Sequence, residues 1–93
     1  MVIYDKKRGE LTFICNKSTN AKMVYLVGNF NNWNPSIKQM TKFKDGSFRA
    51  RMKLPAGNYE YKFVADKIWM EDPDVEVKVQ NPFGSTNSVV KVS

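Results

Sequence analysis

The chain has 93 residues, of which 42% are hydrophobic and 13% aromatic, and its formal net charge is +6 at pH 7. This length predicts one globular domain over residues 1–93. The lack of histidine removes the most common general base and metal ligand, and the single Cys15 excludes an internal disulfide and a thiolate cluster. No apolar stretch approaches the ~18 residues of a membrane helix, and charges occupy the place of a signal-peptide core, so we expect a soluble, cytoplasmic protein without membrane contact.

Apolar and polar residues alternate with a period of two along most of the chain, which is typical of half-buried strands. In chain order, the pattern predicts strands at residues 9–15, 23–28, 47–54, 59–65, 75–79 and 88–92. Asn, Gly, Asp and Pro separate these runs, as expected of turns. We therefore predict an all-β fold, an immunoglobulin-like antiparallel β-sandwich of about seven strands. Its core is expected to contain Phe13, Phe48, Tyr59, Tyr61 and Phe63.

The stretch "GNFNNWNP", residues 28–35, carries a tryptophan in a loop rich in turn-forming residues. A large aromatic side chain in such a place either folds back over the core or is displayed for a ligand. Because the alternating strand positions already supply a core, Trp33 is a candidate for display, and Phe30 is expected to pack beneath the loop.

Further aromatic and polar residues lie near other turns. Trp69 follows the turn at residues 65–67, and Lys62 projects from the outward face of the preceding strand. Just before the last strand lie Phe83, Ser85 and Asn87. Loops distant in sequence meet at one end or edge of a sandwich. Indole rings offer flat apolar surfaces, and Asn, Ser and Lys offer hydrogen bonds, so the set suits an uncharged, hydroxyl-rich polymer such as a polysaccharide.

Three segments carry a resemblance to a known family: "VYLVGNFNNW", "LPAGNYEYKFVADKIWMEDP" and "NPFGSTNSVVKV". Together they resemble the family-48 carbohydrate-binding module, which includes the glycogen-binding domain of the AMP-activated protein kinase β subunit and the N-terminal domains of branching and debranching enzymes. The resemblance extends from about Glu10 to Val92. It implies non-catalytic binding of α-1,4-glucans, such as glycogen, starch and maltodextrins, without a metal or another cofactor.

The resemblance also implies roles for individual residues. Trp33 and Trp69 match the two indoles that stack on glucose units, and Lys62 and Asn87 match residues that hydrogen-bond to sugar hydroxyls. Phe83 and Ser85 stand where the kinase domain has a leucine and a threonine that support the glucan. Where family members often have Asp-Gly before the second tryptophan, this chain has Asp66-Lys67, and a non-glycine residue in such a turn is expected to carry some strain.

Each of these residues also has an ordinary structural explanation. Lys62 taken alone is typical of a solvated surface, Asn87 is typical of a residue that bonds to its own loop backbone, Phe83 is compatible with a cap on the core, and Ser85 needs no special purpose. The leading alternative function is a structural or protein-interaction domain of the same fold, accessory to a glycogen-metabolising enzyme or a kinase.

Two other classes fit less well. The cations do not cluster around the aromatic residues as a phosphate-tracking groove requires, so nucleic acid is only a minor alternative. An enzyme is the poorest fit, because Glu71, Asp72 and Asp74 are interpreted as a solvated turn rather than as a glycosidase pair, and a small sandwich offers no deep cleft.

Overall fold

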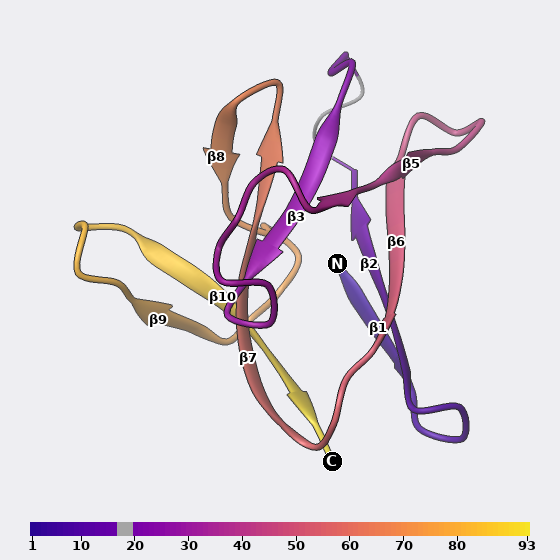
Figure 1. Ribbon diagram of the computed structural model, residues 1–93, viewed down its shortest axis with the longest axis vertical. Coiled ribbons are helices and arrows are strands. Elements are labelled where there is room, and N and C mark those ends of the chain that lie inside the picture. Colours follow the sequence, from indigo (N-terminus) through magenta and orange to yellow (C-terminus); the bar gives the residue numbers. More distant parts are fainter. Residues whose placement is uncertain (17–19) are drawn as a thin grey trace.

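In the computed structural model, residues 1–16 and 20–93 are described, and they form two antiparallel sheets without any helix (Figure 1). No helix that is long and apolar enough to cross a membrane is therefore found in these ranges. The predicted all-β sandwich is confirmed. The strands are β1 Val2–Asp5, β2 Glu10–Cys15, β3 Val24–Gly28, β4 Lys38–Gln39, β5 Thr41–Lys42, β6 Phe48–Lys53, β7 Gly57–Ala65, β8 Ile68–Met70, β9 Lys78–Gln80 and β10 Thr86–Val92.

The first sheet has the strand order β1-β2-β6-β5 and turns one face toward the core. Its strands follow the period-two pattern, so that Phe13 of β2 lies opposite Ala50 of β6 and both are buried. On the other face, Thr12 lies opposite Arg51, which is exposed. The alternation read from the sequence therefore predicts correctly which side chains point inward.

The second sheet has the order β4-β3-β7-β10-β9, with β8 also paired to β7. One edge of β7 pairs with β3 along residues 61–65. The other edge is shared, because residues 57–61 pair with β10 and residues 63–65 pair with β8. The central position of β7 means that its outward side chains have neighbours from three other strands.

Aromatic rings fill the space between the two sheets. The ring centroids of Phe13 and Tyr61 are 4.9 Å apart in an edge-on arrangement, and those of Tyr61 and Phe63 are 5.8 Å apart. All three side chains, together with Phe48, are almost fully buried, whereas Tyr59 is partly buried against the cluster. Burial of this apolar area, at about 25 cal/mol per Å², is the main stabilising contribution available to a chain without disulfides.

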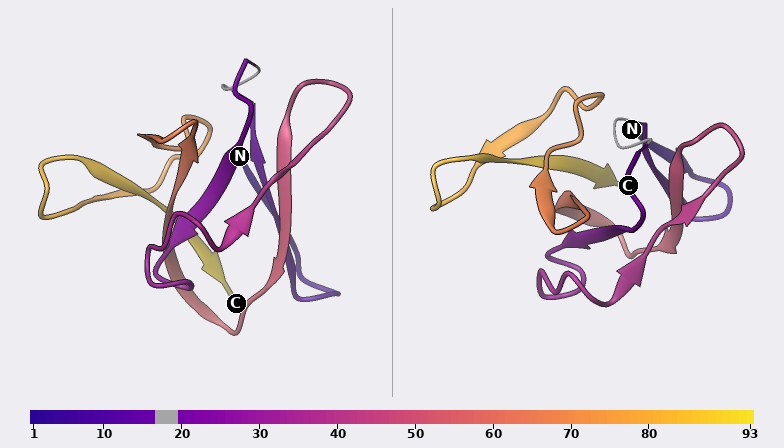
Figure 2. Two further views of the ribbon diagram at one scale, coloured as in Figure 1. Left: turned by 45° about the horizontal axis from the view of Figure 1, so that its top comes forward. Right: turned by 90° about the horizontal axis from the view of Figure 1, so that it is seen from above.

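The predicted strand at residues 75–79 is largely wrong. Only Lys78–Gln80 forms a strand, and it pairs with the first residues of β10 alone. The resulting hairpin projects from the body of the sandwich (Figure 2), so the opposite sheet does not cover it. Val77 and Val79 are consequently 60% and 38% exposed, because alternating valines are buried only where a second layer is present.

The number of strands also exceeds the prediction, since ten are present in the described ranges. The additional strands β1, β4, β5 and β8 have four residues or fewer. Such short runs carry no measurable alternation, and their pairing is decided by the longer strands beside them.

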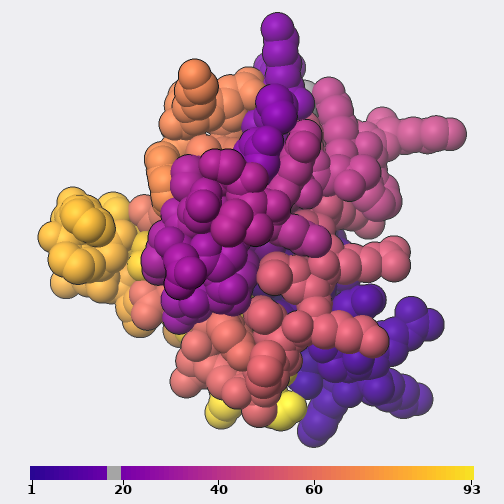
Figure 3. Space-filling model, viewed as in Figure 1, coloured from indigo at the N-terminus to yellow at the C-terminus, as the bar shows by residue number. Residues whose placement is uncertain are grey.

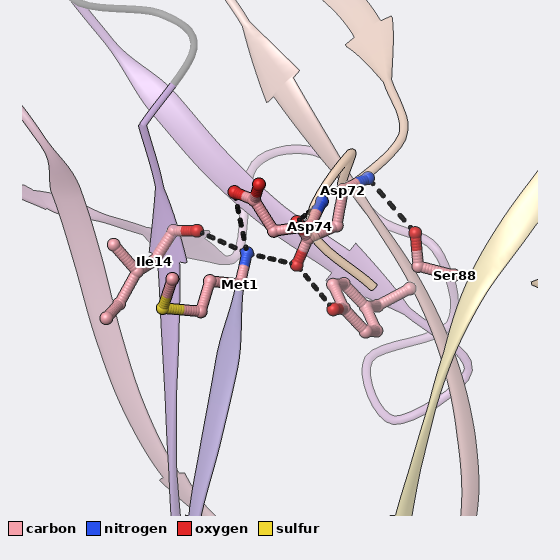
Figure 4. A network of polar contacts seen from close by, with 6 residues as sticks. Met1, Ile14, Asp72, Asp74 and Ser88 are labelled. Carbon is pink, nitrogen blue, oxygen red and sulfur yellow. Dashed lines mark hydrogen bonds and ion pairs between the residues drawn. The ribbon is translucent and has the colours of Figure 1, made fainter. Parts of the chain in front are cut away.

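Asp72 corrects the interpretation of residues 71–74 as a solvated turn, because its side chain is fully buried. Its Oδ2 atom accepts hydrogen bonds from the Tyr61 hydroxyl, at 2.6 Å, and from the amino group of Met1 (Figure 4). Its backbone N–H donates to Ser88 Oγ at 3.0 Å. Burial, followed by the hydrogen bond to Asp72, raises the pKa of Tyr61 far above its usual value. Polar contacts inside the protein thus connect the segment after β8 to β7, to β10 and to Met1, the residue before β1.

Candidate functional site

The loop after β3 is ordered by its own asparagine. Asn31 Oδ1 accepts a hydrogen bond from Gly28 N–H and Asn31 Nδ2 donates to the Leu26 carbonyl, each at 3.1 Å. Trp33 N–H donates to the Gly28 carbonyl at 3.0 Å, and Trp33 has a left-handed backbone with φ of 56°. A side chain at Gly28 would clash with the Phe30 ring, so the tight turn requires glycine. These contacts set the direction of the Trp33 side chain.

Phe30 covers the core beneath this loop, as expected. Its ring lies 5.9 Å from Phe13 and 6.3 Å from Tyr59, measured between centroids. Trp33 is half-buried, but it is not among the apolar side chains that pack on the core cluster in the part of the chain described. The loop therefore needs only one of its two aromatic rings for packing, which leaves Trp33 beside the solvent.

The two-residue turn between β7 and β8 has φ of 47° at Asp66 and 72° at Lys67, so both residues adopt the left-handed conformation that type I′ hairpins require. The Asp66 carboxylate accepts hydrogen bonds from the N–H groups of Lys22 and Met23. These backbone bonds, the one from Met23 foremost, lower the pKa of Asp66. The turn positions Trp69, which lies opposite Val64 and is 46% exposed.

We expect Lys67→Gly to stabilise the protein by about 1 kcal/mol, because glycine removes the steric cost of a left-handed backbone. Thermal unfolding should show a midpoint several degrees higher. Lys44→Gly is the matched control, since it makes the same exchange in an exposed loop residue that is not among those with positive φ. A Lys67→Gly protein that is no more stable than wild type would contradict strain in the turn.

The tip of the β9–β10 hairpin displays Phe83, whose side chain is 91% exposed. Asn81 Oδ1 accepts hydrogen bonds from the N–H groups of Phe83, at 2.9 Å, and Ser85, at 3.3 Å, which orders the backbone of the tip. The alternative in which Phe83 caps the core is therefore wrong. A phenyl ring held this far into the solvent buries little apolar area within the fold and is available for an external contact.

A polar network connects the hairpin to the outward face of β7. Lys62 Nζ donates to Ser85 Oγ at 2.9 Å, and Asn81 Nδ2 donates to both Ser85 Oγ, at 2.8 Å, and Asn87 Oδ1, at 3.0 Å. Asn87 Nδ2 donates to Glu60 Oε1 at 3.0 Å. Lys62 is thus not a freely solvated lysine, and Asn87 bonds to side chains of β7 and the hairpin. The network keeps Lys62 and Asn87 in defined positions while leaving part of their hydrogen-bonding capacity unused.

A groove of about 770 Å³ lies between the β3–β4 loop, β7, β8 and the β9–β10 hairpin. Figure 3 shows the hairpin as a separate lobe beside the face covered by the β3–β4 loop. The groove is lined by all six residues singled out in the sequence: Trp33, Lys62, Trp69, Phe83, Ser85 and Asn87. It is also lined by Asn29, Glu60, Gln80, Asn81 and Pro82, which sequence reasoning missed.

Two of the missed residues had a signal in the sequence. Glu60 lies two positions before Lys62 and therefore shares its outward face. Asn81 opens the turn "NPFG", where asparagine commonly organises the backbone. Gln80 and Pro82 enter the groove only because the hairpin folds toward β7, which no local pattern reveals.

The chemistry of the groove is that of an apolar surface edged with hydrogen-bonding groups. No group of three or more potential metal ligands occurs among the described residues. Lys62 and Glu60 carry opposite charges, so the lining has no strong net charge of either sign. Neither indole N–H has a hydrogen-bond partner within residues 1–16 and 20–93, and both remain available as donors. Such a groove suits a neutral ligand with an apolar face and many hydroxyl groups.

Comparison with known proteins agrees with this chemistry. Residues 12–93 match the family described as the glycogen recognition site of AMP-activated protein kinase. Among individual relatives, subunit beta-2 of 5'-AMP-activated protein kinase from Homo sapiens is 36% identical over 75 residues, which cover 81% of this chain and 26% of the relative. Subunit beta-1 from Bos taurus is 41% identical over 71 residues, which cover 76% of this chain and 25% of the relative.

A solved structure extends the comparison to the fold. The crystal structure of a maltogenic amylase from S. marinus superposes with a TM-score of 0.74 at 26% sequence identity, over 90% of this chain and 13% of the amylase chain. The chain is therefore similar to a small part of a larger enzyme. It likewise spans only about a quarter of the kinase subunits named above, at 26% and 25% of their lengths.

Proposed function

Because the chain belongs to the family of glycogen recognition domains found in AMP-activated protein kinase, we propose that it binds α-1,4-glucans such as glycogen, starch and maltodextrins without catalysing a reaction. The observation that carries this proposal is the groove in which two partly exposed indoles, one from the β3–β4 loop and one from β8, lie with a set of polar side chains. The fold alone would support many functions, whereas this combination of groups suits a ligand with an apolar face and many hydroxyl groups, such as a sugar.

In the proposed complex, Trp33 and Trp69 stack on the apolar faces of glucose rings, which costs little entropy because indoles are rigid. Lys62 and Asn87 hydrogen-bond to sugar hydroxyls. Phe83 presses on the glucan from the hairpin, and Ser85 supports the position of Lys62 through their 2.9 Å hydrogen bond. Affinity is expected to be modest, because an open groove gains little from electrostatics with an uncharged polymer and must restrict its flexibility.

The relatives indicate where such a domain is used. Their names place the matching region in subunits of a protein kinase, and the amylase places a similar fold within a glycan-processing enzyme. We propose that the domain acts beside a kinase or a glycogen-metabolising enzyme and directs it to its glucan.

Tryptophan fluorescence tests the proposal directly. Titration with maltoheptaose should shift the emission, because both indoles lose water when glucose rings cover them, and the midpoint should be nearly independent of NaCl concentration. Cellohexaose, whose β-linkages give a straight chain, is the matched control. Emission that stays constant up to millimolar maltoheptaose would contradict glucan binding. Tight binding of an oligonucleotide that weakens steeply with salt would favour nucleic acid instead.

A further inference from the structure

The outward face of β7 continues beyond the groove described above. Glu60 and Lys62 line that groove, and the next alternating positions, Val64 and Asp66, line a second groove of about 570 Å³. Because side chains at every second position share one face of a strand, the two grooves follow each other along β7. Trp69 lines both of them and forms the boundary between them.

The floor of the second groove is a row of three side chains across three strands. Tyr25 of β3 lies opposite Val64 of β7, and Val64 lies opposite Trp69 of β8. At about 4.8 Å between neighbouring strands, the two strands that carry the aromatic rings are about 10 Å apart. Met23, which is 44% exposed, adds apolar surface at one side. The second groove thus repeats the arrangement of two aromatic groups around an apolar floor.

Polar groups surround this floor. Ser36 lines the groove from the β3–β4 loop, and Lys22 and Lys67 line it from the side of the β7–β8 turn. The Tyr25 hydroxyl and the Lys67 ammonium group have no hydrogen-bond or ion-pair partner within the described part of the chain, whereas the charge of Lys22 interacts with the Asp66 carboxylate. The Asp66 carboxylate, in contrast, is occupied by backbone N–H groups. Free donors and acceptors at the edge of an aromatic surface are the groups that contact sugar hydroxyls.

We propose that this second groove, defined by Tyr25, Val64 and Trp69, is an additional α-glucan subsite that a long chain reaches by crossing Trp69. The inference rests on the proposed function and extends it to a preference for chain length. Continuity supports it, because the Trp69 indole lines both the first groove and the second.

The proposal has a measurable consequence for chain length. The backbone from residue 60 to residue 66 spans about 20 Å when extended, which exceeds the reach of a short oligosaccharide seated in the first groove. A long chain seated in the first groove holds its remaining units at high effective concentration near the second. Long linear maltodextrins should therefore bind more tightly than maltotriose. The difference should exceed the statistical gain that a long chain has because it can place many equivalent three-glucose segments in the first groove.

Calorimetric titrations with maltotriose and with a linear maltodextrin longer than maltoheptaose provide the test. Tyr25→Ala should weaken binding of the long chain about tenfold and leave maltotriose unchanged. Tyr25→Phe retains the ring and should weaken the long chain about threefold through loss of the hydroxyl. Ile68→Ala is the control, because Ile68 is 68% exposed on β8 and lines neither groove. Circular dichroism checks that each variant is folded.

The outcomes separate the two proposals. Unchanged long-chain affinity in a folded Tyr25→Ala or Tyr25→Phe protein overturns the second subsite while glucan binding by wild type stands. Equal weakening of both ligands also overturns it, because Tyr25 would then act through the first groove. Failure of wild type to bind either ligand refutes the proposed function itself, and the second subsite with it.

Discussion

Trp33→Ala and Trp69→Ala are each expected to weaken maltoheptaose binding about thirtyfold, which corresponds to about 2 kcal/mol. Each substitution removes a flat apolar surface that the glucose ring otherwise covers, and each leaves the polar network of Lys62 and Asn87 intact. Neither indole belongs to the apolar side chains of the core cluster in the described ranges. The loss should therefore appear in binding rather than in folding. Isothermal titration calorimetry measures the affinity, and thermal unfolding monitors the fold.

Phe43→Ala is the matched control for removal of an exposed aromatic ring. Phe43 is 41% exposed, lies between β5 and β6, and is absent from both grooves. This variant should bind maltoheptaose as wild type does. Unchanged affinity in Trp33→Ala or in Trp69→Ala would refute the stacking role assigned to that residue. The double variant should have no measurable binding, because neither of the two indoles that line the groove remains.

Asp72→Asn is expected to destabilise the protein by about 3 kcal/mol, since it breaks a buried, charge-assisted network. In the native protein, Asp72 Oδ2 accepts from the Tyr61 hydroxyl and from the Met1 amino group, and Oδ1 accepts from Asp74 N–H. An asparagine amide must place its NH₂ group on one side or the other. One donor then faces another donor inside the protein, whichever way the amide is turned.

Urea denaturation measures this loss, and thermal unfolding should show a midpoint lower by roughly 12–24 °C for a domain of this size. Asp74→Asn is the control. The Asp74 side chain is 37% exposed, and the substitution removes only an ion pair of 3.9 Å with the Met1 amino group. Such a partly solvated pair contributes little. An Asp72→Asn protein as stable as Asp74→Asn would show that the buried network contributes nothing to folding.

Some residues of the candidate groove could be predicted from the sequence and others could not. Trp33, Trp69 and Lys62 could be selected from turn positions and from the outward phase of a strand, because those are local properties. Glu60 points to the same outward face of the strand as Lys62, but a lone glutamate on a strand is ordinarily solvated. The local sequence therefore did not predict that Glu60 contacts Asn87. Their 3.0 Å hydrogen bond exists because β7 and β10 are neighbours in the sheet.

The burial of Asp72 could not be predicted from the sequence. In the sequence, "EDPD" has every property of a solvated turn, and an aspartate there is expected to face water. Its burial depends on Tyr61, Ser88 and the amino group of Met1, which lie 11, 16 and 71 positions away in the chain. A buried carboxylate is tolerated only where such partners are already in place, so no local pattern could have revealed it.

The sequence by itself determined that the chain is a β-sandwich of the glycogen recognition family. It also determined which face of each long strand points inward and which aromatic residues are not needed for the core. These properties follow from alternation and from short motifs, which act over a few neighbouring residues. Only the tertiary structure decided that the β9–β10 hairpin projects uncovered, that two grooves meet at Trp69, and that Asp72 is buried. Those outcomes depend on which strands become neighbours, and that choice is made by packing between residues far apart in the chain.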